Sequence, residues 1–203
     1  MFRDKELLNH VRREAESCII HQTQSDIRFD ISRLLRQPVM QAVFTETLRL
    51  RAHGFVVRSA SKKDIIINDW KIPRNKFIMM SSTPGHMSAS VWCNGASESH
   101  PVEEFWPGRF LHYSESTKAL EFSMNKTKGA WMPFGGGHHP CPGRHISKVE
   151  ILLAMALLTT TYDCEILASE RDLEMSCRNF GLGVLGPANK VPVRMRRRVR
   201  CEL

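Results

Sequence analysis

Residues 131–146 read WMPFGGGHHPCPGRHI, and this stretch carries most of the information in the chain. Its cysteine, Cys141, is followed by Pro142 and Gly143 and then by apolar residues at helical spacing, so the thiol is expected at the N-terminus of a helix. Unpaired N–H groups and the positive end of the helix dipole at such a place stabilise a thiolate. The stretch therefore favours an ionised sulfur ligand at this position.

The residues around the cysteine leave room for a large group. Glycines at 135–137 permit a tight turn without side chains, and Gly143 lets something large and flat approach the backbone. Phe134 can pack near the sulfur and shield it from water, while His139 and Arg144 add donor groups. Such surroundings are typical of a thiolate that is bound to a metal macrocycle and tempered by N–H groups directed at the sulfur.

Two other interpretations of the cysteine stay open at this point. Cys141 could be a buried structural thiol, or it could bind zinc together with His138 and His139. Neither accounts for the glycines, the phenylalanine and the arginine at their spacings.

The same stretch resembles the haem-binding signature of the cytochrome P-450 family, FxxGxxxCxG followed by Arg, at Phe134, Gly137, Cys141, Gly143 and Arg144. The context of a loop followed by a helix also matches. The resemblance implies haem b (iron protoporphyrin IX) as cofactor and Cys141 as its metal ligand, with electron density from the thiolate favouring O–O cleavage. It further implies that the cofactor-binding residues are Phe134, Gly137, His139, Cys141, Gly143 and Arg58.

Two further motifs follow the family's order. Glu46 and Arg49 lie three residues apart on a helix predicted for residues 38–51, so their side chains share a face. Residues 101–110, PVEEFWPGRF, resemble the family segment PxxFxPxRF. The resemblance implies a buried structural triad of Glu46, Arg49 and Arg109, in which planar guanidinium groups hold one carboxylate. Without it, E-x-x-R would indicate only an exposed ion pair.

Several single positions elsewhere in the chain either match the family pattern or differ from it. Arg58, on the first predicted strand, and His139 match positions that often contact a haem propionate, although each could be a surface cation. Gly108 stands where the family often has Glu, Ile146 where it usually has Phe, and Ser147 where it usually has Ala.

The periodicity predicts a fold that is mainly α with small β-sheets (α+β). The resemblance identifies it as the C-terminal half of the cytochrome P-450 fold, a single partial domain over residues 1–203. The expected elements are a helix over 4–18 with Asp4 as N-cap, a helix over 38–51 stopped by Gly54, strands of one small sheet at 55–60, 64–68 and 76–81, an irregular segment with a short helix over 81–101, a long loop over 114–140, a helix over 146–158, and two or three strands after Asp163 separated by a turn near Gly181, Gly183, Gly186 and Pro187.

Composition excludes some classes of function. The chain is 42% hydrophobic and 25% charged, with a net charge of +8, as in an ordinary globular protein with acidic partners. Near the C-terminus, Val193, Met195 and Val199 alternate with arginines at 194, 196, 197, 198 and 200, which predicts an edge strand with one wet face. Because no aromatic residues lie between the arginines, nucleic acid is not an expected partner. The six cysteines form no CxxC pair, so we expect no disulfides, reduced thiols and an intracellular location.

No signal peptide is recognisable at the N-terminus, and the longest apolar run, residues 151–158, is too short for a membrane anchor. Complete family members are expected at the endoplasmic reticulum membrane. They also contain a central distal helix with an acid–alcohol pair, which has no counterpart here. We therefore expect a truncated chain that supplies the proximal half of a haem site and no catalytic side chain.

The resemblance implies a haem-thiolate monooxygenase. Such an enzyme takes electrons from an NADPH-dependent reductase and inserts one oxygen atom of O2 into a small apolar substrate. Two alternatives remain at this stage: a haem-thiolate isomerase or dehydratase acting on a peroxide, and a non-catalytic fragment.

Overall fold

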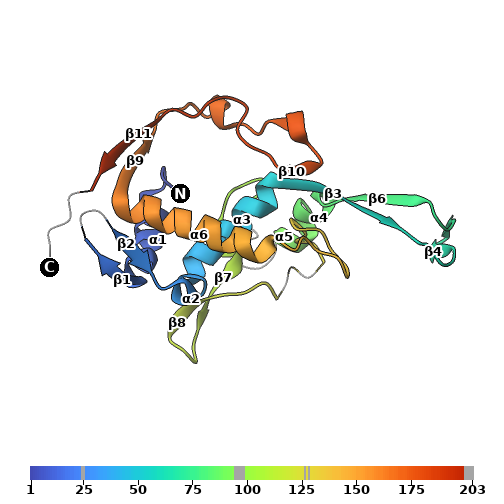
Figure 1. The fold of residues 1–203 in the computed structure, drawn as a ribbon, viewed down its shortest axis with the longest axis horizontal. Helices are drawn as coiled ribbons and strands as arrows, with labels where there is room; N and C mark the ends of the chain where they lie inside the picture. The colour runs from blue at the N-terminus through green and yellow to red at the C-terminus, as the bar shows by residue number, and fades with distance from the viewer. Residues whose placement is uncertain (24–25, 94–98, 126, 128, 199–203) are drawn as a thin grey trace.

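The computed structural model describes residues 1–23, 26–93, 99–125, 127 and 129–198 of the chain. Short antiparallel strand pairs alternate with helices, consistent with the predicted α+β class (Figure 1). The helices are α1 (Lys5–Ser17), α2 (Ile31–Leu34), α3 (Pro38–Arg51), α4 (Thr83–His86), α5 (Ala89–Trp92) and α6 (Arg144–Thr161), with 3-10 turns η2 (Pro107–Phe110), η3 (Arg171–Leu173) and η4 (Cys177–Asn179). The strands are β1 (Ile19–Gln22), β2 (Ile27–Phe29), β3 (Ala52–Ser59), β4 (Ile65–Ile67), β5 (Trp70–Ile72), β6 (Phe77–Ser81), β7 (Leu111–Ser114), β8 (Ala119–Phe122), β9 (Tyr162–Ile166), β10 (Leu182–Val184) and β11 (Val193–Arg197).

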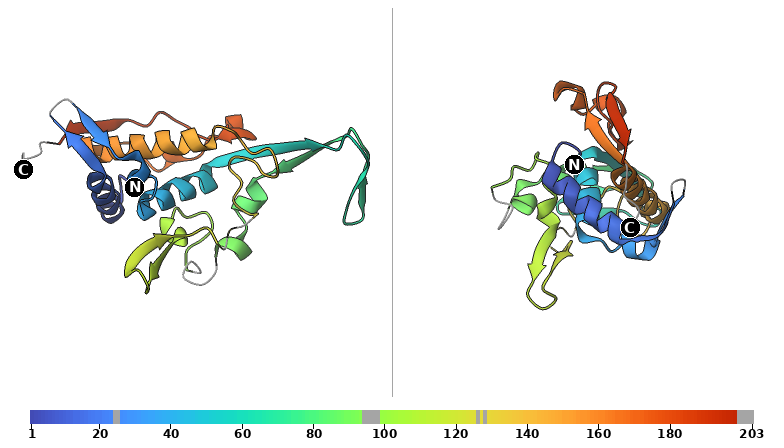
Figure 2. Two further views of the ribbon diagram at one scale, coloured as in Figure 1. Left: turned by 60° about the horizontal axis from the view of Figure 1, so that its bottom comes forward. Right: turned by 90° about the vertical axis from the view of Figure 1, so that its left-hand side faces the viewer.

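The main core lies where α1, α3 and α6 pack together, at one end of the molecule and away from the arm formed by β3 and β6 (Figure 2). Val11 from α1, Met40 and Val43 from α3, and Leu152 and Ala156 from α6 are buried there. Met40 and Val43 are three residues apart and Leu152 and Ala156 four apart, so each pair shares one face of its helix.

Glu14 fixes α3 to α1. Its carboxylate oxygens accept hydrogen bonds from the backbone N–H groups of Val39 and Met40, each at 2.9 Å. Gln37, at the N-cap position of α3, makes no side-chain cap of its own. A carboxylate from a neighbouring helix thus supplies the negative charge that the N-terminus of α3 favours.

The predicted strands at 55–60, 64–68 and 76–81 are present, but they do not form one sheet. β3 and β6 belong to a sheet of order β10-β3-β6, whereas β4 pairs with β5, a strand that the sequence did not indicate, in a separate hairpin near the end of the arm (Figure 1). The predicted helix over 38–51 is confirmed, but the role of Gly54 as its stop signal is wrong: α3 ends at Arg51 and Gly54 pairs with Leu182 inside the sheet. The chain passes directly from helix to strand, so no left-handed cap is required.

Two further expectations need correction. The predicted loop over 114–140 begins with a hairpin, because β7 and β8 pair from Leu111 with Phe122 to Ser114 with Ala119. No residue of its four-residue strands is buried, so they lack the buried alternation that marks a strand. Within the described residues of the segment 81–101, namely 81–93 and 99–101, there are two short helices, α4 and α5, instead of the one expected.

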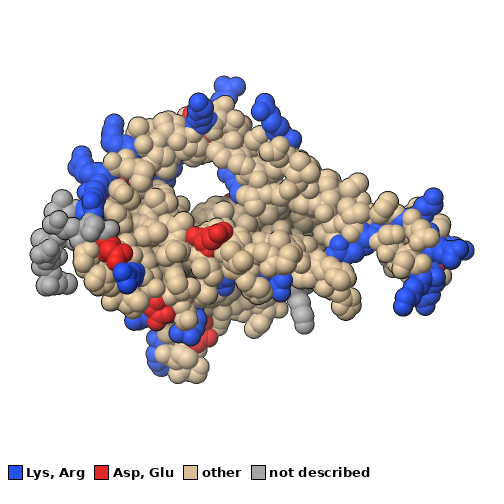
Figure 3. Space-filling view, in the orientation of Figure 1, with Lys and Arg blue, Asp and Glu red and all other residues tan. Residues whose placement is uncertain are grey.

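From Tyr162 on, the described part of the chain contains the strands β9, β10 and β11, in agreement with the two or three predicted after Asp163. The turn predicted at Gly183 is wrong, because Gly183 lies within β10. β9 and β11 pair, while the segment between β9 and β10 arches away from α6, and Figure 3 shows an opening through the molecule beneath this arch. The expectation that β11 has one dry face is wrong, since Val193 is 41% exposed and Met195 49% exposed. Neither face of β11 is covered, because its side chains are exposed throughout. Val199 and Arg200 lie outside the described residues.

Candidate haem-binding site

The segment from Trp131 to Gly143, which precedes α6, has a defined backbone shape. Gly135 and Gly137 each have φ of +76°, a conformation that glycine adopts without strain. The N–H of Gly135 donates to the carbonyl of Met132 at 3.2 Å, and the N–H of Cys141 donates to the carbonyl of Phe134 at 2.8 Å. These two hydrogen bonds close the turn and place Cys141 next to the start of the helix.

Cys141 is exposed at this point. Gly143 is the N-cap of α6, and a Cβ atom placed on it would lie 3.8 Å from the Cys141 sulfur. The exposure of Cys141 excludes a buried structural thiol. No group of three His, Cys, Asp or Glu side chains capable of holding a metal ion occurs among the described residues, which include His138 and His139.

Arg58 reaches the cysteine loop from β3. Its guanidinium donates to the backbone carbonyls of Gly136 at 2.6 Å and of His139 at 3.4 Å. The His139 side chain is exposed, so the structure brings a fixed cation and a titratable ring to the same part of the loop. Both are available to a negatively charged group bound beside it.

Phe134 forms the apolar side of the loop. Its ring contacts Trp131 edge-to-face, with 6.2 Å between centroids, and packs against the main core. The ring is therefore anchored, while its role as a shield for the sulfur stays a prediction.

Glu46, Arg49 and Arg109 meet in the interior. The Glu46 carboxylate accepts from Arg49 Nε at 2.7 Å and Nη2 at 2.8 Å, and from Arg109 Nε at 3.2 Å. The backbone N–H of Trp106 donates to the same carboxylate at 3.1 Å. Glu46 and Arg49 are fully buried and the Arg109 side chain is 2% exposed. A buried carboxylate with this many donors is satisfied, and removing one partner would leave an uncompensated charge.

Other contacts of the two arginines spread this cluster over the neighbouring segments. Arg49 Nη1 donates to the carbonyl of His86 at 2.9 Å, and Arg109 donates to the carbonyls of Trp92 at 2.6 Å and His100 at 3.0 Å. The triad therefore ties α3 to α4, α5 and the segment before η2.

Two contacts join the cysteine loop to this scaffold, and sequence reasoning missed both. Trp131 Nε1 donates to the Thr45 carbonyl on α3 at 3.1 Å, and the backbone N–H of Met132 donates to His86 Nε2 at 2.9 Å. No local signal marks either contact, because the partners lie 86 and 46 residues apart in the chain.

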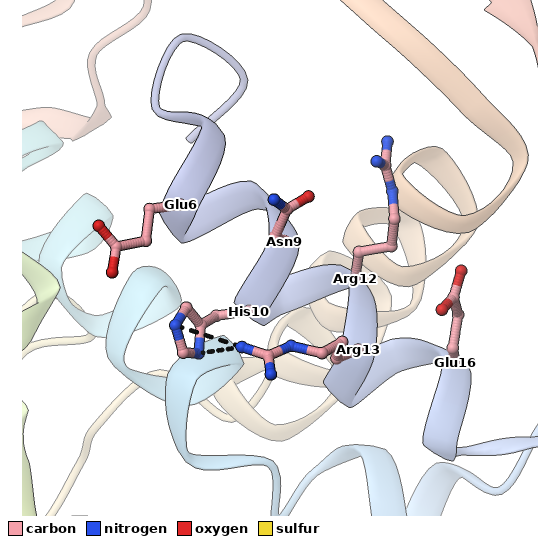
Figure 4. A pocket seen from close by; sticks show the side chains of 6 residues that line it. All are labelled: Glu6, Asn9, His10, Arg12, Arg13 and Glu16. Carbon is pink, nitrogen blue, oxygen red and sulfur yellow. Dashed lines mark hydrogen bonds between the residues drawn. The ribbon is translucent and has the colours of Figure 1, made fainter.

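A hollow elsewhere on the surface runs along α1 and contains none of the predicted site residues (Figure 4). Its side chains come from one helix, and an Arg13 guanidinium nitrogen lies 3.0 Å from the His10 ring. The lining residues are Glu6, Asn9, His10, Arg12, Arg13 and Glu16.

The donor set at the cysteine loop fits a haem. An exposed thiol can serve as an axial ligand, Arg58 and His139 can pair with carboxylates, and the glycine turn leaves the approach open. Five cysteines in the described part of the chain, including Cys141, are free thiols; Cys201 lies outside it. No helix in that part is sufficiently long and apolar to cross a membrane.

Comparisons with known proteins agree with this geometry. A family model described as cytochrome P-450 matches residues 1–193. A cytochrome P-450 monooxygenase of Hormonema carpetanum is 33% identical over 220 aligned residues, covering 96% of this chain and 38% of that protein. Another, of Humicola fuscoatra, is 31% identical over 216 residues, covering 96% and 37%. The chain thus spans less than two fifths of the length of these relatives, and it belongs to the cytochrome P-450 family.

Proposed function

We propose that residues 1–203 are a single partial domain, the C-terminal haem-binding portion of a cytochrome P-450 monooxygenase, in which the thiolate of Cys141 would bind the iron of haem b. One observation carries this proposal: an exposed thiol on a hydrogen-bonded glycine turn, immediately before α6, in a chain of this family. When bound, haem supplies an iron that activates dioxygen with electron donation from the thiolate.

The residues of the chain bind and orient the cofactor. Cys141 would hold the iron, Arg58 and His139 would pair with the carboxylates, and Phe134 would limit the access of water to the sulfur. Gly137 and Gly143 keep the approach free of side chains. The triad acts at a distance, by fixing the segments on which the loop rests. No residue of the chain is assigned a catalytic role in proton delivery.

In the whole protein, the proposed activity inserts one oxygen atom of O2 into a small apolar substrate. The other atom is reduced to water by two electrons, which come from NADPH through a reductase, and two protons. We place the complete protein inside the cell at the endoplasmic reticulum membrane, with no nucleic-acid partner.

Residues 1–203 alone are expected to lack coupled turnover. Large apolar side chains are exposed on the three-stranded sheet, where Phe77 is 81% exposed, Met79 65% and Leu182 85%. In a soluble domain such surfaces are normally covered. We infer that the remaining part of the family fold covers them and completes the haem pocket.

A second candidate activity is that of a haem-thiolate isomerase or dehydratase acting on a peroxide. A rat relative named prostacyclin synthase is 28% identical over 168 residues and covers 80% of this chain, so the relatives are not confined to proteins named as monooxygenases. Turnover of an organic hydroperoxide without NADPH, in a complete protein, would favour this candidate. A chain that binds no haem at all would instead be a non-catalytic fragment.

The test of haem ligation is optical. The chain is supplied with haem, reduced and exposed to carbon monoxide, and the complex should show the strongly red-shifted Soret band of thiolate ligation. Cys141→Ser should lose this band, because a neutral hydroxyl is a poor ligand. Cys177→Ser, at another exposed free cysteine, should keep it. An unchanged spectrum in Cys141→Ser would overturn the assignment.

A further inference from the structure

His86 is a fully buried histidine at the C-terminal end of α4, between the triad and the cysteine loop. Its backbone carbonyl accepts from Arg49 Nη1 at 2.9 Å, and its ring Nε2 lies 2.9 Å from the backbone nitrogen of Met132. One residue therefore contacts both parts of the site, through its backbone on one side and its ring on the other.

The contact with Met132 determines the state of the ring. A backbone N–H can only donate, so Nε2 is the acceptor and the ring proton resides on Nδ1. Burial lowers the pKa of His86 to about 4; the charges of His53 and Arg49 act in the same direction, and the Ala52 and Arg49 backbone groups oppose it. The ring is thus neutral near pH 7.

No hydrogen bond of normal geometry reaches His86 Nδ1 within the described part of the chain, although the Ala52 backbone raises the pKa of the ring. Burying an unpaired N–H group is unfavourable, and an apolar side chain of similar size would avoid the cost. The Nε2 contact with Met132 is therefore the polar interaction that distinguishes histidine from leucine at this position.

From Met132 the hydrogen bonds lead to the cysteine. The carbonyl of Met132 accepts from Gly135 N–H, and the carbonyl of Phe134 accepts from Cys141 N–H, so the turn that carries Cys141 begins at the residue held by His86. The base of this turn also packs closely on α4: a Cβ on Gly85 would lie 2.8 Å from the Ala130 carbonyl oxygen. This close packing brings the His86 ring within hydrogen-bond distance of the Met132 backbone N–H.

We propose that His86 is a positioning residue for the cysteine loop: its Nε2 holds the Met132 N–H and thereby fixes the turn that presents Cys141, while its carbonyl couples this turn to the Glu46–Arg49 pair. The effect on haem rests on the proposed function. The effect on the loop does not, because it concerns hydrogen bonds within the chain itself.

The first arm of the test uses the haem-free chain. Hydrogen exchange is followed in peptides that cover residues 130–135, for His86→Leu and His86→Gln. His86→Leu removes the acceptor, so exchange of the Met132 amide should be roughly tenfold to a hundredfold faster. His86→Gln keeps an acceptor oxygen at a similar reach and should restore protection. Leu34→Ala, which opens the core at a buried position outside the loop, should lower global stability without this local change.

The second arm uses the haem-loaded chain and measures the share of the reduced carbon monoxide complex that shows the thiolate band. His86→Leu should lower this share several-fold, and His86→Gln should return it towards the wild-type value. Leu34→Ala should reduce the amount of loaded protein but not the share.

The outcomes separate the two proposals. Equal amide exchange in wild type and His86→Leu, or an equal local change in Leu34→Ala, would overturn the role of His86. A wild-type chain that takes up haem but shows no thiolate band would overturn haem ligation by Cys141, and the exchange arm would still decide whether His86 holds the loop.

Discussion

Replacing Glu46 by alanine would leave two arginine side chains, Arg49 and Arg109, buried without the carboxylate that they share. The wild-type carboxylate accepts three guanidinium hydrogen bonds at 2.7, 2.8 and 3.2 Å and one from the Trp106 backbone at 3.1 Å. Breaking a buried ion pair by removing one partner costs about 3–5 kcal/mol. Because whole domains have unfolding free energies of roughly 5–15 kcal/mol, this loss would be a large share of the total.

Urea denaturation of wild type and Glu46→Ala measures this loss. The matched control is Glu115→Ala: Glu115 pairs with Lys118 at the same i,i+3 spacing and at 2.6 Å, but the two side chains are 79% and 70% exposed. The control should lose no more than about 1 kcal/mol, as exposed pairs do. Glu46→Ala should also fail to retain haem. A loss of less than about 1 kcal/mol, or normal haem content, would refute the view that the pair supports the site.

Two further predictions concern Glu14 and the exposed apolar surface. Burial raises the pKa of Glu14 in the folded chain. The protonated carboxyl group therefore contributes stability below the unfolded pKa of 4.5, and this contribution is lost as the pH rises through the raised folded pKa. Between these two pKa values, the urea midpoint of wild type should fall relative to that of Glu14→Gln, and a constant difference would contradict this. Residues 1–203 should bind apolar dyes, because side chains such as Phe77 remain uncovered. When supplied with haem, a competent reductase and NADPH, they should release peroxide instead of oxygenated product, because the haem pocket is incomplete. Coupled product formation by this chain alone would show that a distal site is present.

Local signals predicted the three long helices, α1, α3 and α6, but not the short helix α2. Asp4 caps α1 by accepting from the Leu7 N–H at 3.0 Å, and Pro38 occupies the first turn of α3, as the sequence indicates. Such features depend on neighbours a few residues away, so they can be read without knowledge of the fold. The positive φ values at Gly135 and Gly137 likewise follow the expectation of a tight turn.

Contacts between segments that are distant in the chain could not be predicted from the sequence alone. Glu14 reaches Met40 across 26 residues, and His86 reaches Met132 across 46; each looks like an ordinary polar residue in its own segment. Arg109 meets Glu46 across 63 residues, and that contact was expected only because of the family resemblance. The separation of β4–β5 from the larger sheet also depends on tertiary packing, since both pairs have similar apolar runs.

X-ray absorption at the iron edge, recorded on the haem-loaded ferric chain, identifies the atoms that are bound to the iron. If Cys141 binds the iron, a sulfur atom should be present in the first coordination shell of wild type and of Cys177→Ser and absent from that of Cys141→Ser. An iron shell with only nitrogen and oxygen ligands in the wild-type chain, or a sulfur signal that survives in Cys141→Ser, would contradict the assignment of Cys141 as the haem ligand.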